Sequence, residues 1–201
     1  MMSKLAVLKN NNKGTTLVEM LVCFVLLSIF ITSAAMIITS TTNLYYQVKA
    51  QTYSDQVQDI VLEKIVSEIE GTKFADAYSD NLKITIDDAH DKVTLYDRTD
   101  TKISMYAENE ELIVFYHPIH NDEVSFDSTE WKFDKNVYNG YKIKELKFYK
   151  GSETIPQTLK DAYNLDEHFS YDENIVLVFL TMNNPKYGEF KTVRPVKCFY
   201  K

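Results

Sequence analysis

Cysteine, glycine and proline are scarce in this chain of 201 residues, which contains two, five and four of them respectively. Two cysteines cannot build the disulfide framework of a small secreted scaffold. The low glycine and proline content excludes a collagen-like fibre and a loop-rich domain, and 45% hydrophobic residues exclude an intrinsically disordered chain. The length fits one or at most two domains.

Positive charge is missing from a long N-terminal stretch, because no Lys or Arg occurs between Lys13 and Lys49. Within it, the 24 residues Thr15–Ile38 include 18 apolar residues and a single charge, Glu19. As a helix this segment is about 36 Å long, enough to cross the hydrocarbon core of a membrane. Residues 1–14 contain three lysines and no acid, so the positive-inside rule predicts that they stay in the cytoplasm.

Simple membrane signals explain this segment incompletely. A cleaved signal peptide has a shorter apolar core, whereas here the apolar run continues past the small residues 33–35 to Ile38. A lipoprotein signal has a small residue before its cysteine, but Cys23 follows Val22. A plain signal anchor fits the hydropathy but leaves Glu19 unexplained, since a carboxylate in an apolar span is costly and usually has a partner.

The residues Lys13-Gly14-Thr15-Thr16-Leu17-Val18-Glu19-Met20-Leu21 resemble the processing motif of type IV pilins and type II secretion pseudopilins. The resemblance implies that a basic leader, residues 1–14, is cut off after Gly14. It also implies methylation of Thr15, a position where the family usually has Phe. Glu19 then stands at the fifth position of the mature chain, where the family carries an acid within its apolar helix.

The family resemblance also implies a role and a set of partners. The chain is expected to be a structural subunit, in our interpretation a minor pilin, of a type IV pilus or related pseudopilus. Its partners are expected to be a prepilin peptidase, the assembly machinery in the cytoplasmic membrane and other pilin subunits that pack helix against helix. We expect a single-pass membrane protein with its head outside before assembly, and an extracellular fibre afterwards. Glu19 is expected to pair with the α-amine of a neighbouring subunit and so to set the axial stagger between the helices of the two subunits.

The helical pattern continues beyond the membrane segment. Val57, Val61, Ile65 and Ile69 form an i, i+4 row, and Gly71 is a predicted stop. We therefore predict one spine helix over residues 15–70, with a transmembrane half, 15–38, and an amphipathic half, 39–70. The β-branched and polar stretch 39–43 is its weakest link. A transmembrane coiled coil is disfavoured because the apolar row is not sustained as heptads.

The remaining residues, 71–201, are predicted to form a β-sheet head that covers the apolar stripe. The overall expectation is an α+β fold with a long N-terminal helix packed on an antiparallel β-sheet. Alternating apolar and polar residues predict a meander of strands joined by acidic turns. The predicted strands lie near 82–86, 93–95, 103–105, 112–116, 143–149, 175–182 and 190–200. The strand 175–182 is expected to be central, 190–200 to be its hairpin partner after a turn at 183–185, and Pro195 to mark an edge. A short helix is predicted over 159–165.

The head offers weak candidates for chemistry. His117 and His120 suggest a metal pair only loosely, since Pro118 separates them and no cysteine is near. The acidic turns at 87–91 and 97–100 lack the spacing of an EF-hand loop, so solvated turns are favoured over calcium sites. Cys198 has no nucleophile signature, and no Ser motif, P-loop or dinucleotide fingerprint is present. We therefore predict no catalytic residues, no metal and no cofactor.

Charge makes nucleic acid an unexpected partner. The formal charge of −7 becomes −10 when the three leader lysines are removed, and such a surface repels phosphate backbones. The only basic cluster surrounds one predicted strand, and we interpret it as a solubilising face: Lys142, Lys144, Lys147 and Lys150. The rival interpretation of the whole chain is a membrane-anchored extracellular enzyme or sensor with an uncleaved signal anchor.

Overall fold

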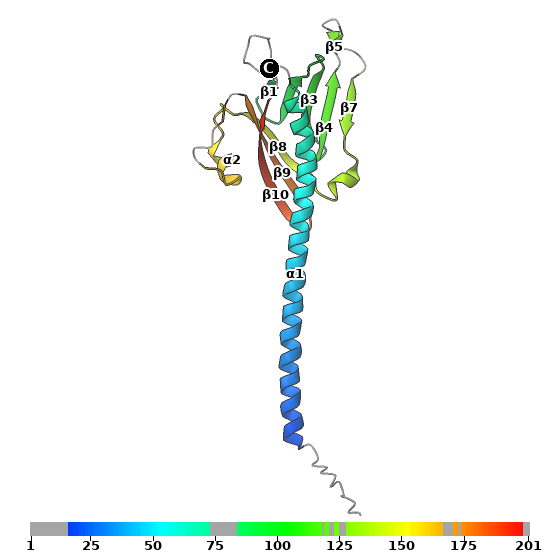
Figure 1. Cartoon of the computed structure of the whole chain (residues 1–201), viewed down its shortest axis with the longest axis vertical. Helices are drawn as coiled ribbons and strands as arrows, with labels where there is room; N and C mark the ends of the chain where they lie inside the picture. The colour runs from blue at the N-terminus through cyan, green and yellow to red at the C-terminus, as the bar shows by residue number, and fades with distance from the viewer. Residues whose placement is uncertain are drawn as a thin grey trace, which may run out of the picture. The chain divides into compact units, whose positions relative to one another are not determined.

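The fold is α+β, with a long N-terminal helix, α1 (Leu17–Glu70), packed against antiparallel β-sheets. A computed structural model describes residues 16–72, 84–117, 128–166, 171–172 and 174–198, together with the backbone of 119–120 and 123–124. Internal contacts divide the chain into two compact units, Met1–Val48 and Lys49–Lys201. Figure 1 labels the α-helices and most of the strands.

The predicted long N-terminal helix is confirmed, because α1 is helical without interruption from Leu17 to Glu70, and its start lies two residues after the predicted start at position 15. The polar stretch 39–43 does not break it. The helix ends where predicted, but Gly71 does not adopt the left-handed conformation of a glycine cap. Instead the Gly71 N–H donates to the Ser67 carbonyl at 3.3 Å, and the Thr72 hydroxyl donates to the Glu68 carbonyl at 3.3 Å. These two bonds satisfy carbonyl groups of the last turn.

The first sheet confirms the predicted meander. Its strand order is β1-β2-β3-β4-β7, with every pair antiparallel. The bounds are β1 (Ile84–Ile86), β2 (Lys92–Tyr96), β3 (Lys102–Glu108), β4 (Glu111–His117) and β7 (Thr129–Lys132). The strand β7 was not predicted, since its residues lack an alternating apolar pattern. A separate pair, β5 (Ile119–His120) and β6 (Glu123–Val124), forms a short two-stranded ladder.

The second sheet has the order β10-β9-β8. Its strands are β8 (Lys142–Lys150), β9 (Ile175–Asn184) and β10 (Gly188–Lys197). The central position of β9, its hairpin with β10 and the edge position of Pro195 were all predicted correctly. The turn predicted at 183–185 was placed too early, because Asn183 and Asn184 still pair with Glu189 and Gly188.

Two backbone hydrogen bonds join the sheets through β8. The Phe148 N–H donates to the His90 carbonyl at 2.7 Å, and the Ile143 N–H donates to the Glu110 carbonyl at 2.9 Å. His90 lies in the turn between β1 and β2, and Glu110 lies in the turn between β3 and β4. Thus β8 runs past two turns of the first sheet, and the predicted single head is built from two sheets.

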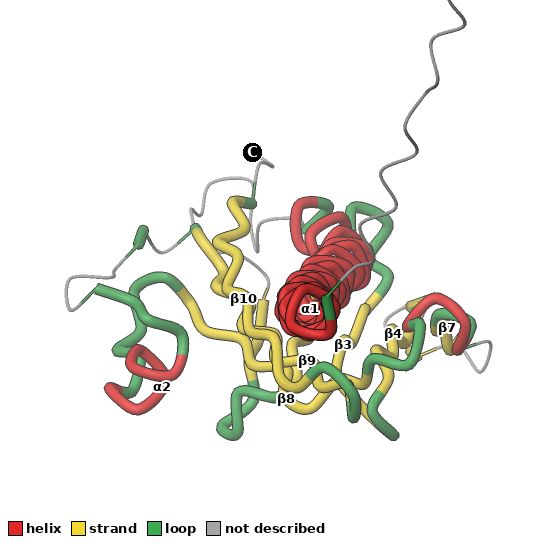
Figure 2. The backbone as a smooth tube through the Cα atoms, turned by 90° about the horizontal axis from the view of Figure 1, so that it is seen from below, coloured by secondary structure: helices red, strands yellow, loops and turns green. Residues whose placement is uncertain are grey.

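Burial explains why the helix and the sheets need each other. The stripe of α1 that faces the head is buried from Ala50 onward and includes Val61 and Ile65, both fully buried. In Figure 2, the helix lies on one face of the strands, with β10 to one side and β4 and β7 to the other. The strand β9 is buried on both faces. One set of side chains lies in the same hydrophobic cluster as the buried residues of α1: Val176, Val178, Leu180 and Met182. Leu177 and Phe179, on the opposite face, belong to a second cluster.

The second cluster is covered by α2 (Gln157–Ala162), which begins two residues earlier and ends three residues earlier than the predicted short helix. On the other side of the head a 3₁₀ turn, Lys135–Tyr138, is capped by Asp134, which accepts a hydrogen bond from the Asn136 N–H at 2.8 Å. The buried Tyr138 hydroxyl then accepts a 2.8 Å hydrogen bond from the Leu112 N–H. The turn therefore fixes the start of β4.

Candidate functional site

The first half of α1 is apolar on every side. The large apolar side chains between Leu17 and Ile38 are 48% to 81% exposed. A helix that is apolar all round is stable only when other helices or lipid cover it. By length and composition α1 is long and apolar enough to cross a membrane, with a mean hydropathy of 2.7 over its best window. This part of the chain is thus the candidate site for insertion into a membrane and for packing against other helices.

Hydroxyl groups within the apolar segment bond to their own helix. Ser28 donates to the carbonyl of Phe24 at 2.7 Å, and Thr32 donates to the carbonyl of Ser28 at 2.8 Å. Ser33 and Thr39 make the same type of bond four residues back, at 2.8 and 2.9 Å. Such back-bonding removes free donors from the helix surface, as an environment without water requires. These polar residues are therefore compatible with an apolar environment.

Glu19 lies in a capping box with Thr16. The Glu19 N–H donates to the Thr16 hydroxyl at 3.3 Å, and the Thr16 N–H donates to the Glu19 carboxylate at 3.4 Å. This reciprocal arrangement satisfies two N–H groups that have no partner inside the first helical turn. The negative carboxylate also lies at the positive end of the helix dipole. Our sequence reading missed this box, although Thr16-x-x-Glu19 has the spacing that signals it.

The structure thus gives Glu19 a local role. It brings Glu19 together with Thr16, whereas Gly14 and Thr15, the predicted cleavage and methylation positions, lie outside the described residues. The cap keeps the carboxylate bonded at the start of the helix. The same carboxylate remains exposed, so it is accessible to a partner outside this chain.

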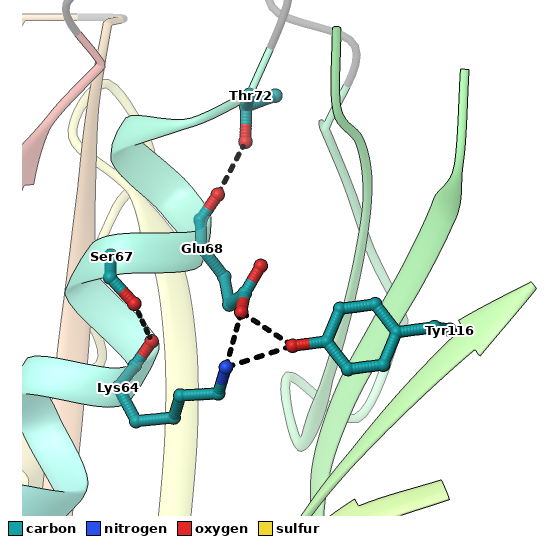
Figure 3. A network of polar contacts seen from close by, with 5 residues as sticks. All are labelled: Lys64, Ser67, Glu68, Thr72 and Tyr116. Atoms are coloured by element: carbon teal, nitrogen blue, oxygen red, sulfur yellow. Dashed lines mark hydrogen bonds and ion pairs between the residues drawn. The ribbon is translucent and has the colours of Figure 1, made fainter. Parts of the chain in front are cut away.

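Near its other end, α1 is joined to the first sheet by a polar network (Figure 3). The Lys64 ammonium donates to Glu68 at 2.6 Å and to the Tyr116 hydroxyl at 2.8 Å, and that hydroxyl donates to Glu68 at 2.5 Å. The ammonium also lies 4.5 Å from the centre of the Trp131 ring, which is favourable for a cation–π contact. The network therefore ties the helix to β4 and β7.

The charges of Lys64 and Glu68 are stabilised by their hydrogen bonds to each other and to Tyr116. Burial alone would lower the pKa of Lys64, but its hydrogen bonds to Glu68 and Tyr116 raise it overall. Burial, followed by the hydrogen bond to Glu68, raises the pKa of Tyr116. Both groups therefore keep their protons at neutral pH. The arrangement is a structural clamp, since its contacts join two residues of α1 to Tyr116 on β4 and Trp131 on β7.

The two acidic turns of the head are self-capped. Asp97 accepts hydrogen bonds from the N–H groups of Thr99 and Thr101, both at 2.8 Å, and Asp87 accepts one from the Lys92 N–H at 3.0 Å. A hydrogen bond with Asp87, together with burial, raises the pKa of Asp91. These contacts explain the carboxylates as turn-forming groups. Among the described residues no group of three or more His, Cys, Asp or Glu side chains is arranged to hold a metal.

The remaining sequence candidates also have local partners. His117 lies 3.1 Å from the Ser128 hydroxyl and beside the Phe115 ring, while the side chain of His120 lies outside the described residues. Burial raises the pKa of the Cys198 thiol to about 11, with Glu70 contributing. Cys23 lies exposed on the apolar helix, and both cysteines are free.

The basic cluster around β8 is mostly paired with oxygen atoms of the head. Lys142 forms an ion pair with Glu110, and Lys144 forms one with Glu189. The Lys147 ammonium donates to the Ala89 carbonyl at 2.7 Å. These contacts offset part of the positive charge of the strand. The arrangement favours the predicted solubilising face.

Comparison with known proteins informs the N-terminal segment. Residues 9–35 match the family described as the prokaryotic N-terminal methylation motif. A search of curated proteins finds no significant match to the chain. The matched segment contains Gly14, Thr15 and the capping box, and it continues into the apolar half of α1. The prepilin-type methylation motif and the pilin-like α+β fold together indicate a subunit resembling type IV pilins and pseudopilins.

Proposed function

We propose that this protein is a minor structural subunit of a type IV pilus or related pseudopilus. The observation that carries the proposal is the continuity of three features: a methylation motif, an all-round apolar helix and a head folded on the second half of that helix. The precursor is inserted in the cytoplasmic membrane with its head outside. A prepilin peptidase then cuts after Gly14 and methylates Thr15, and the helix enters the fibre.

Mass spectrometry tests the processing step. The full chain produced together with a prepilin peptidase should lose residues 1–14 and gain one methyl group on Thr15. Gly14→Val places a branched side chain at the cut bond and should leave the chain intact, while the control Asn11→Val should be processed normally. A wild-type chain that keeps Met1 would contradict the proposal and favour a membrane tether for an extracellular enzyme or sensor.

The proposed assembly contact is made by Glu19. In a bundle of apolar helices an unpaired carboxylate costs on the order of 3 kcal/mol at the bilayer centre and less near its edge. Pairing with the α-amine of Thr15 in a neighbouring subunit offsets this cost. A wrong stagger leaves both charges unpaired, so the pair selects one register between helices.

Two substitutions separate this charge pair from the capping box. Glu19→Gln keeps an oxygen that can accept the Thr16 N–H bond but removes the charge, whereas Glu19→Ala removes both. We expect both variants to be processed yet absent from fibres, and the control Glu63→Gln, on an exposed face of α1, to be incorporated normally. Normal incorporation of Glu19→Gln would contradict the charge pair, because it retains only the cap.

The assignment as a minor subunit rests on the size of the head. Residues 71–201 carry a core in two clusters and a separate short helix, α2, which enlarge the head beyond a single sheet on a helix. We expect immunogold labelling to place this chain at few positions per fibre. Labelling at regular intervals along every fibre would make it a major subunit instead.

A further inference from the structure

The first unit of the chain ends in a pair of exposed tyrosines. Tyr45 and Tyr46 are 60% and 49% exposed, and their rings meet edge to face with centroids 5.8 Å apart. They follow the polar stretch 39–43, and the next charged residue in the sequence is Lys49. Tyrosine rings are enriched at membrane–water interfaces, where an apolar ring carries a polar tip.

The spacing along α1 matches the layers of a bilayer. Thr39 follows Glu19 by 20 positions, which corresponds to about 30 Å of helix and to the thickness of a hydrocarbon core. Tyr45 follows Glu19 by 26 positions, or about 39 Å, so with Glu19 and Thr39 at the two hydrocarbon boundaries the backbone of Tyr45 lies about 9 Å outside the outer one. Side chains of a helix lean toward its N-terminus, so the tyrosine rings reach back from there into the headgroup layer. One placement therefore puts both ends of the apolar segment in polar layers at once.

This placement also accounts for the polar residues between the two ends. The hydroxyls of Ser28 and Thr32 fall in the hydrocarbon layer, where their bonds to carbonyls four residues back satisfy them. Glu19 falls at the inner boundary, where a carboxylate costs less than at the bilayer centre. Residues 39–43 fall among the outer headgroups, which can bond to side chains that an apolar layer cannot.

We infer that Tyr45 and Tyr46 form an aromatic anchor in the phosphate and glycerol layer of the outer leaflet, and that this anchor sets the depth of the precursor helix. The inference rests on the proposed membrane-inserted precursor and adds the depth at which its helix lies in the bilayer. Both rings lie within the headgroup layer, where their faces contact glycerol and ester groups and their hydroxyls bond to polar headgroup atoms. Movement outward takes the rings into water, and movement inward takes the polar residues 39–43 into the hydrocarbon layer.

Spin labels on single cysteines measure the depth directly. The full chain carrying Cys23→Ser is reconstituted in vesicles of phosphatidylglycerol and phosphatidylethanolamine, and a nitroxide is attached to Tyr46→Cys or to the control Phe30→Cys. Cys198 is only 4% exposed, so it stays unlabelled in the folded head. We expect the label at 30 to be accessible to oxygen but not to a nickel chelate, and the label at 46 to lie at headgroup depth.

A second pair of variants tests whether the tyrosines set this depth. With the label at Phe30→Cys, replacing both tyrosines by alanine should shift the label by several ångströms, about one helical turn or 5.4 Å at most. Replacing both by tryptophan should leave it in place. An unchanged depth in the alanine variant would overturn the anchor, as would spin–spin broadening at position 46 that shows a second helix covering the pair.

The failure of the anchor can be told from the failure of the proposed function. If the label at 30 is shielded from nickel while the alanine variant keeps its depth, only the anchor is lost. If the label at 30 is accessible to nickel, the segment does not span the bilayer, and both the anchor and the membrane-inserted precursor are overturned.

Discussion

The hydroxyl of Tyr116 on β4 donates a 2.5 Å hydrogen bond to the carboxylate of Glu68 on α1, 48 positions earlier in the chain. The same hydroxyl accepts a hydrogen bond from Lys64, one helical turn before Glu68. One phenol thus fixes both the rotation of the helix and its distance from the first sheet. The charged side chains are only 21% and 16% exposed, so solvent cannot easily replace the missing contact.

Tyr116→Phe should therefore weaken the attachment of α1 to the sheet. The substitution keeps the ring but removes two hydrogen bonds to partly buried charges, and we expect a loss of roughly 1–3 kcal/mol in the free energy of unfolding. Urea unfolding of the full chain in detergent measures it. The matched control is Tyr106→Phe on β3, whose ring lies near Lys92 and whose hydroxyl makes no hydrogen bond within the described residues. Equal losses in the two variants would contradict the clamp.

Alkaline pH should release the same clamp. The pKa of Lys64 and the pKa of Tyr116 are both raised above their ordinary values of 10.5 and 10.0. A group whose pKa is raised on folding stabilises the fold below its unfolded pKa and loses that effect as pH rises through the folded pKa. The free energy of unfolding should therefore fall above about pH 10. The fall should be shallower in Tyr116→Phe, and parallel pH profiles would argue against the coupling.

The spacing of apolar residues predicted most of this fold, because a helix or strand that is buried on one face carries apolar residues at the period of that face. The apolar row of α1 predicted the helix over residues 15–70, and the alternation along β1, β2 and β3 predicted strands of the head. The run from Ile175 identified a central strand, since only a strand covered on both faces lacks polar alternates. The two-sheet arrangement was not predictable, because the bonds from β8 to His90 and Glu110 depend on how the turns meet in space.

The misses have physical causes of their own. The strand β7 has the sequence Thr-Glu-Trp-Lys, in which Trp131 is the one apolar residue, so no alternating pattern marks it, and its pairing with β4 joins residues distant in the sequence. The contacts of Tyr116 join residues about fifty positions apart and leave no local trace. The capping box at Thr16 was different, because its spacing was visible in the sequence.

Gly151 occupies a position where a side chain has no room. A Cβ atom there would lie 2.4 Å from the Asp172 carbonyl oxygen and 2.8 Å from the Tyr171 Cβ. The backbone is also fixed, since the Gly151 N–H donates to the Ile175 carbonyl at 2.7 Å. Gly151→Ala should therefore push the segment at 171–172 away from β8. We expect a loss of roughly 1–3 kcal/mol in the free energy of unfolding.

The control for Gly151 is Gly71→Ala. Its added Cβ would meet the helix carbonyls of Ser67 and Glu68 at 3.4 and 3.5 Å, an ordinary contact, and its backbone conformation suits alanine. Less freedom in the unfolded chain should then make this variant neutral or more stable by up to about 1 kcal/mol. Thermal unfolding of the full chain in detergent compares the two. A Gly151→Ala variant as stable as Gly71→Ala would mean that the 171–172 segment moves without cost.

The capping box predicts a local effect at the start of α1. Thr16→Val keeps the shape of the side chain but removes the oxygen that accepts the Glu19 N–H bond. Loss of such a cap costs about 1 kcal/mol, so the Glu19 amide should exchange its hydrogen about fivefold faster. Hydrogen exchange followed by NMR on the full chain in detergent micelles measures this. In Thr32→Val the lost hydroxyl only donates to the Ser28 carbonyl, and the Glu19 amide should keep its rate. Equal exchange of that amide in the wild type and Thr16→Val would show that Thr16 does not cap the helix.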